Sequence, residues 1–147
     1  MTRLSPHFTL EELTFSSTAQ RLCIDNEPTG SAVHNLPLLA QGLEMVRDLL
    51  GDHPIHIDSG YRCPKLNSAI GGSRHSAHMD GYAADFLCHE YGSPRDVVLA
   101  VAGSSIPFDQ LIFEGSWVHI SFATQLRRQV LTAVFDHGRT AYTAGIA

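Results

Sequence analysis

The side chains in this sequence that most clearly suggest chemistry are His78 and Asp85, which lie seven residues apart with Gly81 between them. Zinc binds imidazole nitrogen and carboxylate oxygen readily, and a catalytic zinc site needs three protein ligands and one open position. The best candidate for a third ligand is His119, in the apolar segment 117–122. Spacing alone leaves open whether His119 is a ligand or a buried structural histidine.

These residues belong to an ordered series of short motifs. The series is Ser59-Gly60-Tyr61-Arg62, Asn67, Gly71-Gly72-Ser73, Ser76-x-His78-x-x-Gly81-x-Ala83-x-Asp85 and Trp117-Val118-His119. The series resembles the M15 family of zinc peptidases, which comprises D-Ala-D-Ala carboxypeptidases and related phage endolysins, and residues 4–13 resemble the start of its compact subgroup. The resemblance implies a fold of the hedgehog/DD-peptidase type and one Zn²⁺ per chain, held by His78, Asp85 and His119.

The resemblance also implies roles for two polar residues. Arg62 would lie beside the metal, where its guanidinium would hold the scissile carbonyl oxygen as charge develops or bind a carboxylate of the substrate. Ser76 would form a hydrogen bond with the substrate backbone. Two alternatives stay open, because Arg62 could instead form a structural ion pair with Asp58, and Ser76 could be an ordinary turn residue.

The general base is indicated less directly. In several relatives a Glu or His lies two or three residues before the last zinc ligand, but here those positions are Trp117 and Ser116. A two-residue loop of Gly115 and Ser116 predicts a type II′ hairpin that pairs Glu114 with Trp117. Side chains alternate along strands, so Glu114 would share a face with His119, at about 7–8 Å. We therefore predict that Glu114 takes the proton of a metal-activated water; the alternative is a solvated carboxylate at a hairpin tip.

Other candidates for a site role are less distinctive. His75 could replace Glu114 as the base, but its neighbours indicate a mobile loop. Trp117 either lines the substrate cleft or belongs to the core. The alternation around His56 predicts a solvent-facing side chain, and Asp109 and Gln110 are predicted to form structural hydrogen bonds.

The elements that must position these residues follow from hydrophobic periodicity and capping residues. Apolar residues at near-helical spacing predict a core-facing helix over residues 35–50, with Pro37 in its first turn and Gly51 at its end. Thr9 and Glu12 match a capping box that opens a short helix. Further helices are predicted over 63–69 and 93–102, and strands over 54–59, 83–87, 108–113 and 117–122. The segment 125–134 is a helix or a strand.

These elements predict an α+β fold, in which helices pack on a small, mostly antiparallel sheet. The chain of 147 residues fits a single domain over 1–147. Apolar residues make up 44%, and no stretch approaches the length of a membrane span. The formal net charge is −5 and no basic stripe is present, so a nucleic-acid partner is not expected. We expect a monomer.

The cysteines and the N-terminus bear on where the protein works. Cys23, Cys63 and Cys88 are widely spaced, and we expect small buried thiols without a disulfide framework. The first residues contain no apolar segment typical of a signal peptide. We therefore expect synthesis in the cytoplasm, and action on the cell wall after release by a lysis system or as part of a phage particle.

Three functions are compatible with the sequence. The first is a zinc peptidase that hydrolyses peptidoglycan stem peptides, as a D-Ala-D-Ala carboxypeptidase or an endolysin-type endopeptidase. The second is a non-catalytic, zinc-stabilised wall-binding or phage structural module, which the missing carboxylate or His at positions 116 and 117 favours. The third is a cytosolic dipeptidase that cleaves free D-Ala-D-Ala.

Overall fold

A six-stranded sheet organises the computed structural model, which describes residues 1–146. Its strand order is β1-β2-β4-β3-β5-β6. β3 and β5 run parallel, and the other neighbouring pairs run antiparallel. The strands are β1 (His56–Ser59), β2 (Ala83–Leu87), β3 (Gln110–Phe113), β4 (Val118–Ser121), β5 (Gln129–Asp136) and β6 (Arg139–Ala144). The predicted α+β class with a mostly antiparallel sheet is confirmed.

Two of the helices begin at capping boxes. Thr9 and Glu12 form the predicted capping box, and Ser93 and Asp96 form a second one. Each box satisfies backbone N–H groups that a helix start leaves without partners. The helices are α1 (Leu10–Thr14), α2 (Ser17–Arg21), α3 (Ser31–Leu49), α4 (Pro64–Ala69) and α5 (Pro94–Ala102), and η1 (Ala77–Asp80) is a 3₁₀ turn.

Helix α3 starts earlier than the sequence analysis predicts. It begins at Ser31, so Pro37 lies inside the helix and the prediction of a first-turn proline is wrong. Proline has no N–H to donate to the carbonyl of Val33, four residues earlier, so one helical hydrogen bond is missing there. Ala32, in the added residues 31–34, is buried, and this burial helps to offset the cost of the proline.

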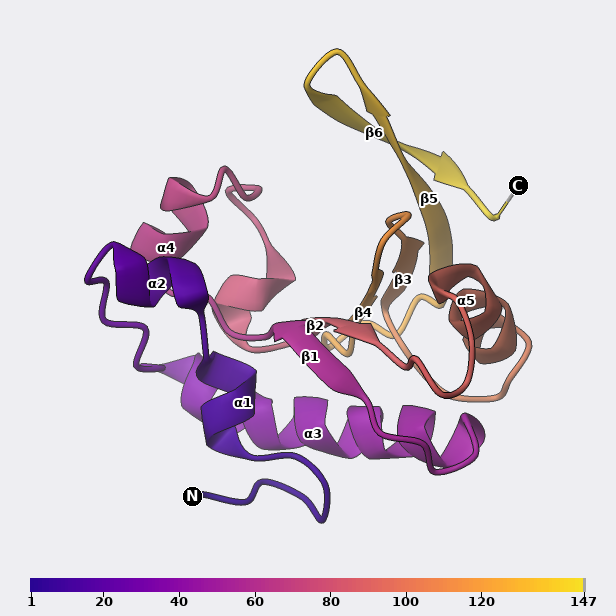
Figure 1. Cartoon of the computed structure of the whole chain (residues 1–147), viewed down its shortest axis with the longest axis horizontal. Coiled ribbons are helices and arrows are strands. Elements are labelled where there is room, and N and C mark those ends of the chain that lie inside the picture. The colour runs from indigo at the N-terminus through magenta and orange to yellow at the C-terminus, as the bar shows by residue number, and fades with distance from the viewer. Residues whose placement is uncertain (147) are drawn as a thin grey trace.

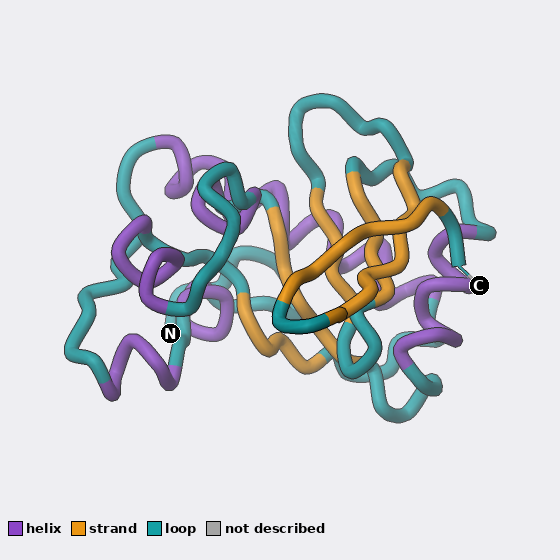
Figure 2. The backbone as a smooth tube through the Cα atoms, turned by 90° about the horizontal axis from the view of Figure 1, so that it is seen from above, coloured by secondary structure: helices purple, strands orange, loops and turns teal. Residues whose placement is uncertain are grey.

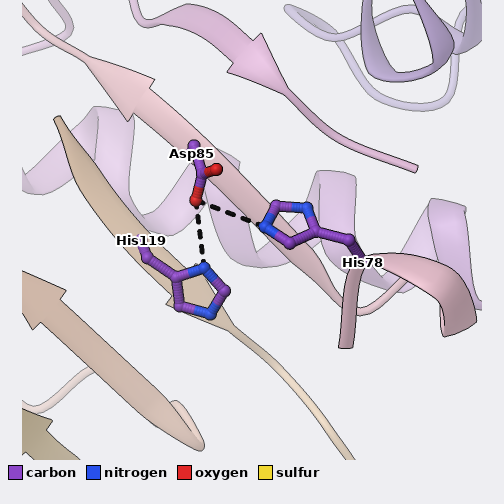
Figure 3. Close-up of side chains that lie close together, drawn as sticks. All are labelled: His78, Asp85 and His119. Atoms are coloured by element: carbon purple, nitrogen blue, oxygen red, sulfur yellow. Dashed lines mark hydrogen bonds and ion pairs between the residues drawn. The ribbon is translucent and has the colours of Figure 1, made fainter. Parts of the chain in front are cut away.

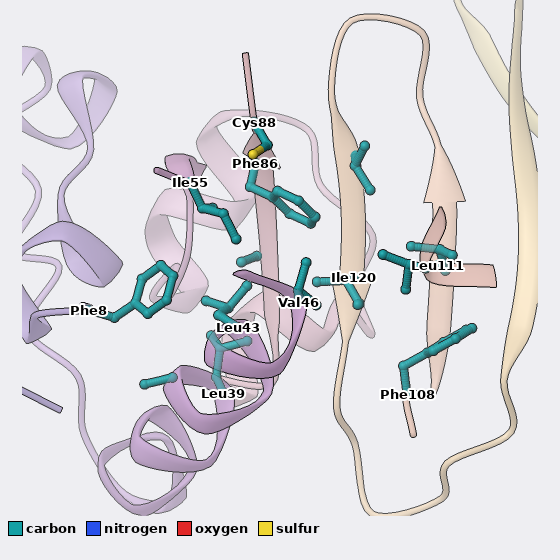
Figure 4. Packing of buried hydrophobic residues seen from close by; sticks show 14 of the residues in the cluster. Phe8, Leu39, Leu43, Val46, Ile55, Phe86, Cys88, Phe108, Leu111 and Ile120 are labelled. Atoms are coloured by element: carbon teal, nitrogen blue, oxygen red, sulfur yellow. The ribbon is translucent and has the colours of Figure 1, made fainter. Parts of the chain in front are cut away.

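The hydrophobic core fills the space between one face of the sheet and helices α3 and α5 (Figure 4). Figure 1 shows α3 running along this side of the sheet. Phe86 from β2 and Ile120 from β4 point into the core, where they meet Leu43 and Val46 of α3. Because side chains alternate along a strand, Asp85 and His119 must lie on the opposite face. The sheet therefore separates an apolar face from a face that carries polar groups.

The C-terminal segment, which the sequence left open between helix and strand, forms the β5–β6 hairpin. β5 joins the sheet beside β3, and Asp109 pairs with Arg127 just before it, at 2.6 Å between Oδ1 and Nε. The hairpin rises on the side of the sheet away from α3 (Figure 1) and crosses in front of other strands when seen from above (Figure 2). Its outer half is exposed on both strands.

The three cysteines differ in their exposure to solvent. Cys88 is buried and Cys63 is partly buried, but Cys23 is exposed in the turn after α2, so the prediction of three buried thiols is wrong for Cys23. The backbone there has a φ of 54°, in the left-handed region. None of the described helices is long and apolar enough to cross a membrane.

Candidate metal centre

The register between β2 and β4 brings two of the candidate ligands together. Asp85 lies directly opposite His119 in this antiparallel pair, so both side chains point to the same face of the sheet. The Nδ1 atom of His119 lies 3.0 Å from Oδ1 of Asp85 (Figure 3). Both side chains are largely buried. A single backbone pairing thus places an imidazole next to a carboxylate away from bulk water.

His78 reaches the same carboxylate from the 3₁₀ turn η1. The hydroxyl of Ser76 caps this turn and accepts a hydrogen bond from the backbone N–H of His78 at 3.2 Å. Gly81 ends the turn with a φ of 74°, a left-handed conformation that glycine adopts without strain. The Nε2 atom of His78 lies 3.3 Å from Oδ1 of Asp85. The chain therefore bends back so that β2 can begin within the same site.

The orientation of the His78 ring is fixed by a backbone carbonyl. Nδ1 of His78 lies 2.7 Å from the oxygen of Gly60. A carbonyl oxygen only accepts hydrogen bonds, so Nδ1 carries the proton and Nε2 keeps its lone pair toward the site. Metal-binding histidines are held in this way by a hydrogen bond at the other ring nitrogen. The contribution of Gly60 was not predicted from the sequence.

Glycine is required at position 60 because the backbone of α1 passes very close. A Cβ atom there would lie 2.3 Å from the carbonyl oxygen of Leu13. The N–H of Tyr61 donates to the same oxygen at 2.7 Å, which ties α1 to the end of β1. The glycine in Ser59-Gly60-Tyr61-Arg62 was the available sequence signal, although the sequence does not show which backbone it approaches.

The two donor distances measured from Asp85 suit a tetrahedral zinc ion. One donor atom from each of His78, Asp85 and His119 lies within 4.8 Å of the others. Ligand atoms about 2.0–2.1 Å from a tetrahedral zinc lie about 3.3–3.4 Å apart. The distances of 3.0 and 3.3 Å from Asp85 Oδ1 to the two nitrogens are close to this value. Three protein donors leave a fourth position open, as in catalytic zinc sites.

The charge states of these groups also suit a metal. Burial lowers the pKa of His78, which favours the neutral imidazole. Burial alone would raise the pKa of Asp85, but the contacts with His78 and His119 outweigh it and hold the pKa below its usual range. A neutral imidazole and an ionised carboxylate are the forms that bind metal ions.

Arg62 lies beside this cluster and not in the alternative ion pair. Its backbone N–H donates to the carbonyl of His78 at 3.1 Å, and its Nη2 donates to the hydroxyl of Ser76 at 3.2 Å. Asp58 pairs instead with His56, at 3.2 Å. Burial lowers the pKa of Arg62, while the charges of Asp85 and Glu114 oppose that change. Nε of Arg62 is buried without a partner in residues 1–146, so this guanidinium has donor capacity left.

Glu114 lies at the end of the predicted hairpin, facing the cluster. Its N–H donates to the carbonyl of Trp117 at 3.1 Å, which confirms the predicted pairing across Gly115 and Ser116. Burial, followed by the negative charge of Asp85, raises the pKa of the Glu114 carboxyl. The nearby indole N–H of Trp117 opposes this rise, although it is buried and does not reach hydrogen-bond geometry. Glu114 is therefore not a freely solvated tip residue.

The remaining sequence candidates lie outside the cluster. His75 is exposed, and its backbone N–H bonds to the hydroxyl of Ser73 within its own loop. His56 is exposed as predicted. Asp109 and Gln110 form the structural contacts that were predicted, with Arg127 and Gln129 respectively. Trp117 is half-buried between the hairpin tip and the site face.

Fold and site together define an α+β protein with a candidate mononuclear metal site of two histidines and one aspartate. The model of the peptidase M15 family matches residues 6–121, so the chain belongs to the peptidase M15 family. The chain is also similar to the zinc D-Ala-D-Ala carboxypeptidase of Streptomyces albus G, with 36% identity over 73 residues. That match covers 50% of this chain and 28% of the relative's length.

Proposed function

We propose that this protein is a zinc-dependent peptidase that hydrolyses peptide bonds of peptidoglycan stem peptides. One zinc ion would be held by His78, Asp85 and His119. The observation that carries the proposal is the convergence of these three donors in a member of the peptidase M15 family. The similarity to a zinc D-Ala-D-Ala carboxypeptidase supports both the metal and the class of substrate.

Zinc supplies a Lewis acid that polarises a carbonyl and makes water a better nucleophile. The surrounding residues would transfer the proton and bind the substrate. Glu114 accepts a proton from the attacking water and passes it to the leaving amine. Its raised pKa supports this role, because a general base and acid works best when its pKa approaches the working pH.

Arg62 would stabilise negative charge on the substrate. Its partly buried guanidinium has an unused N–H at Nε and is under the electrostatic influence of Asp85 and Glu114. A partly desolvated cation with an unused donor is suited to a carbonyl oxygen that gains charge, or to a terminal carboxylate. Ser76, which bonds to Arg62, would orient the substrate backbone, and Trp117 would line the bound peptide.

The position of the cleaved bond distinguishes two forms of the proposal. If Arg62 binds the C-terminal carboxylate, the protein is a carboxypeptidase; if it holds the scissile carbonyl of an internal bond, it is an endopeptidase. The stem pentapeptide L-Ala-γ-D-Glu-L-Lys-D-Ala-D-Ala contains both kinds of bond. We expect the zinc-loaded protein to cleave it, and the fragment masses to identify the bond. A His119→Ala variant serves as the control that lacks one ligand.

The outcome of this assay also tests a second candidate function. A non-catalytic module that binds wall peptides or assembles into a phage particle is favoured by the absence of a Glu or His at positions 116 and 117. Stoichiometric zinc binding without release of any fragment from the pentapeptide would overturn the peptidase proposal in favour of this module. As a peptidase, the protein would act on the wall after release by a lysis system or from a phage particle.

A further inference from the structure

The β5–β6 hairpin brings a residue toward the site from outside the segment that matches the family model. That match ends at residue 121, and the hairpin covers residues 129–144. β5 runs parallel to β3 with Phe113 opposite Thr132, so the next position places Ala133 beside Glu114. Ala133 pairs in turn with Tyr142 of β6. Glu114, Ala133 and Tyr142 therefore form one row across the sheet.

Tyr142 points to the same face as the candidate ligands. Residues directly opposite one another in neighbouring strands project to the same face, and every second residue along a strand does so too. Glu114 pairs with Trp117, which is two residues from His119, so the row shares the face of the metal site. The hairpin also rises on this side of the sheet (Figures 1 and 2). The small side chain of Ala133 leaves room between Glu114 and the tyrosine ring.

The electrostatic surroundings of Tyr142 agree with this placement. Burial raises the pKa of its phenol, and the negative charges of Glu114 and then Asp85 raise it further. The phenol is therefore a neutral O–H donor at neutral pH. Its hydroxyl makes no hydrogen bond within residues 1–146, and the side chain is 53% exposed. Tyr142 thus has a half-exposed ring and an O–H group free to donate. It lies close enough to Glu114 and Asp85 for their charges to affect its pKa.

We propose that Tyr142 is a substrate-positioning residue of the peptidase site. Its phenol O–H donates a hydrogen bond to a backbone carbonyl of the bound peptide, and its ring covers the peptide from the side opposite Arg62. Phe135 lies on the same face of the hairpin, 60% exposed, and extends this apolar wall outward. The inference rests on the proposed function and adds that the hairpin supplies part of the peptide-binding surface.

Two substitutions separate the hydroxyl from the ring. Tyr142→Phe removes the donor alone, and Tyr142→Ala removes the ring as well. Thr143→Ala is the matched control, because Thr143 is an exposed neighbour on the opposite face of the same strand. Since Tyr142 and Thr143 are both exposed, we expect all three variants to keep the wild-type melting temperature within experimental error and to bind zinc stoichiometrically.

The first measurement is of KM and kcat on the stem pentapeptide. The second is of the affinity for the same peptide by calorimetry, with each substitution combined with Glu114→Gln in the zinc-loaded protein. The Glu114→Gln substitution limits turnover of the peptide during the titration. Tyr142→Phe should raise KM and weaken peptide affinity by about three- to tenfold, the value of one hydrogen bond. Tyr142→Ala should weaken both further, while Thr143→Ala leaves both unchanged. In the Tyr142 variants kcat should change less than KM, because the residue binds the peptide and does not take part in proton transfer.

Two results would overturn the inference, and they differ in what they say about the proposed function. If the wild type cleaves the pentapeptide and both Tyr142 variants match it in KM and affinity, Tyr142 has no positioning role and the peptidase proposal stands. If the zinc-loaded wild type neither cleaves nor binds the pentapeptide, the proposed function fails, and the role of Tyr142 fails with it.

Discussion

At the scale of single residues, the candidate metal site is defined by two histidine nitrogens that converge on one oxygen of Asp85. Both histidine nitrogens lie within 3.3 Å of that oxygen, and the carbonyl of Gly60 turns His78 toward it. In the absence of a metal, the lone pair on Nε2 of a neutral His78 would face the Asp85 carboxylate oxygen at 3.3 Å without a proton between them. A cation that binds all three groups explains their convergence more simply than a structural hydrogen-bond network.

Removing one donor should therefore remove the metal. We expect His78→Ala, Asp85→Ala and His119→Ala each to weaken zinc binding by more than the roughly 10- to 100-fold that loss of an outer-shell partner costs. Metal content after dialysis against a competing chelator measures the effect. His56→Ala is the control, because His56 also pairs with an aspartate, Asp58, but is exposed and distant in the chain from the cluster. Full zinc content in His119→Ala would exclude His119 as a ligand.

Glu114→Gln tests the general base separately from the metal. The amide cannot take up a proton, so we expect kcat on the stem pentapeptide to fall by about 10²–10⁴-fold. Zinc content should not change, because Glu114 is not among the three donors. Glu90→Gln, at an exposed turn, should have wild-type kcat. Activity that survives in Glu114→Gln would mean that another group takes the proton.

At the scale of elements, the hairpin between β3 and β4 was predictable, since Gly115 and Ser116 fix the register that places Glu114 opposite Trp117. The start of α3 and the course of the C-terminal segment were not. Pro37 is a strong local signal for a helix start, and the burial of Ala32, a tertiary contact, favours an earlier start. The β5 strand depends on pairing with β3, a long-range contact that local periodicity does not contain.

The same limit applies to the candidate site. His78, Asp85 and His119 could be predicted together from the sequence, because their motifs occur in the same order as in the M15 family. The roles of Gly60 and Tyr142 depend on which backbone or strand lies beside them. Gly60 acts through its carbonyl, which every residue type has, and Tyr142 depends on the register of two strand pairs.

Glu44 of α3 connects the N-terminal segment to the body of the protein, and this connection should depend on pH. Its carboxylate accepts hydrogen bonds from the hydroxyl of Ser5 at 2.6 Å and from the N–H of His7 at 2.7 Å. Burial raises the pKa of Glu44, but the Ser5 hydroxyl and the imidazole and backbone N–H of His7 together lower it below the ordinary value of 4.5. A lowered pKa in the folded state means that Glu44 stabilises the fold above about pH 4.5 and that this contribution is lost as the pH falls further.

We expect Glu44→Gln to reduce the free energy of unfolding by about 1–3 kcal/mol at pH 7, because a bond to a charged acceptor is replaced by a weaker one. The difference from the wild type should shrink on acidification below pH 4.5. Denaturant unfolding at pH 7 and pH 3.5 measures both effects, with the exposed Glu27→Gln as the control. An equal difference at both pH values would show that the Glu44 charge does not stabilise the fold.

At the scale of the whole molecule, one face of the sheet packs on the hydrophobic core and the other carries the candidate metal ligands. Helices α3 and α5 cover the first face and form the core, while the second carries the candidate ligands. The family match covers the core and the ligands, and the β5–β6 hairpin lies beyond it. We infer that residues within the family match carry out the reaction, and that selectivity for the peptide depends in part on the β5–β6 hairpin.

Zinc bound between η1, β2 and β4 would link the η1–β2 segment to β4, since Asp85 and His119 lie 34 residues apart in the chain. A ligand that binds only the folded state stabilises it by about 2.7 kcal/mol at 100 times its Kd. For a chain of this size we therefore expect zinc at that concentration to raise Tm by about 5–10 °C. The Asp85→Ala variant should show no such rise. A wild-type Tm that does not respond to zinc would contradict a specific site.

The most direct test of the central claim, that this site performs zinc-dependent peptide hydrolysis, uses purified peptidoglycan. The zinc-loaded protein is incubated with it, with chelator added and then with zinc restored, and released fragments are identified by mass spectrometry. The account predicts that peptide fragments are released, that release stops with chelator, and that it resumes with zinc. Release that continues in the presence of chelator, or no release from a protein that holds zinc stoichiometrically, would contradict it.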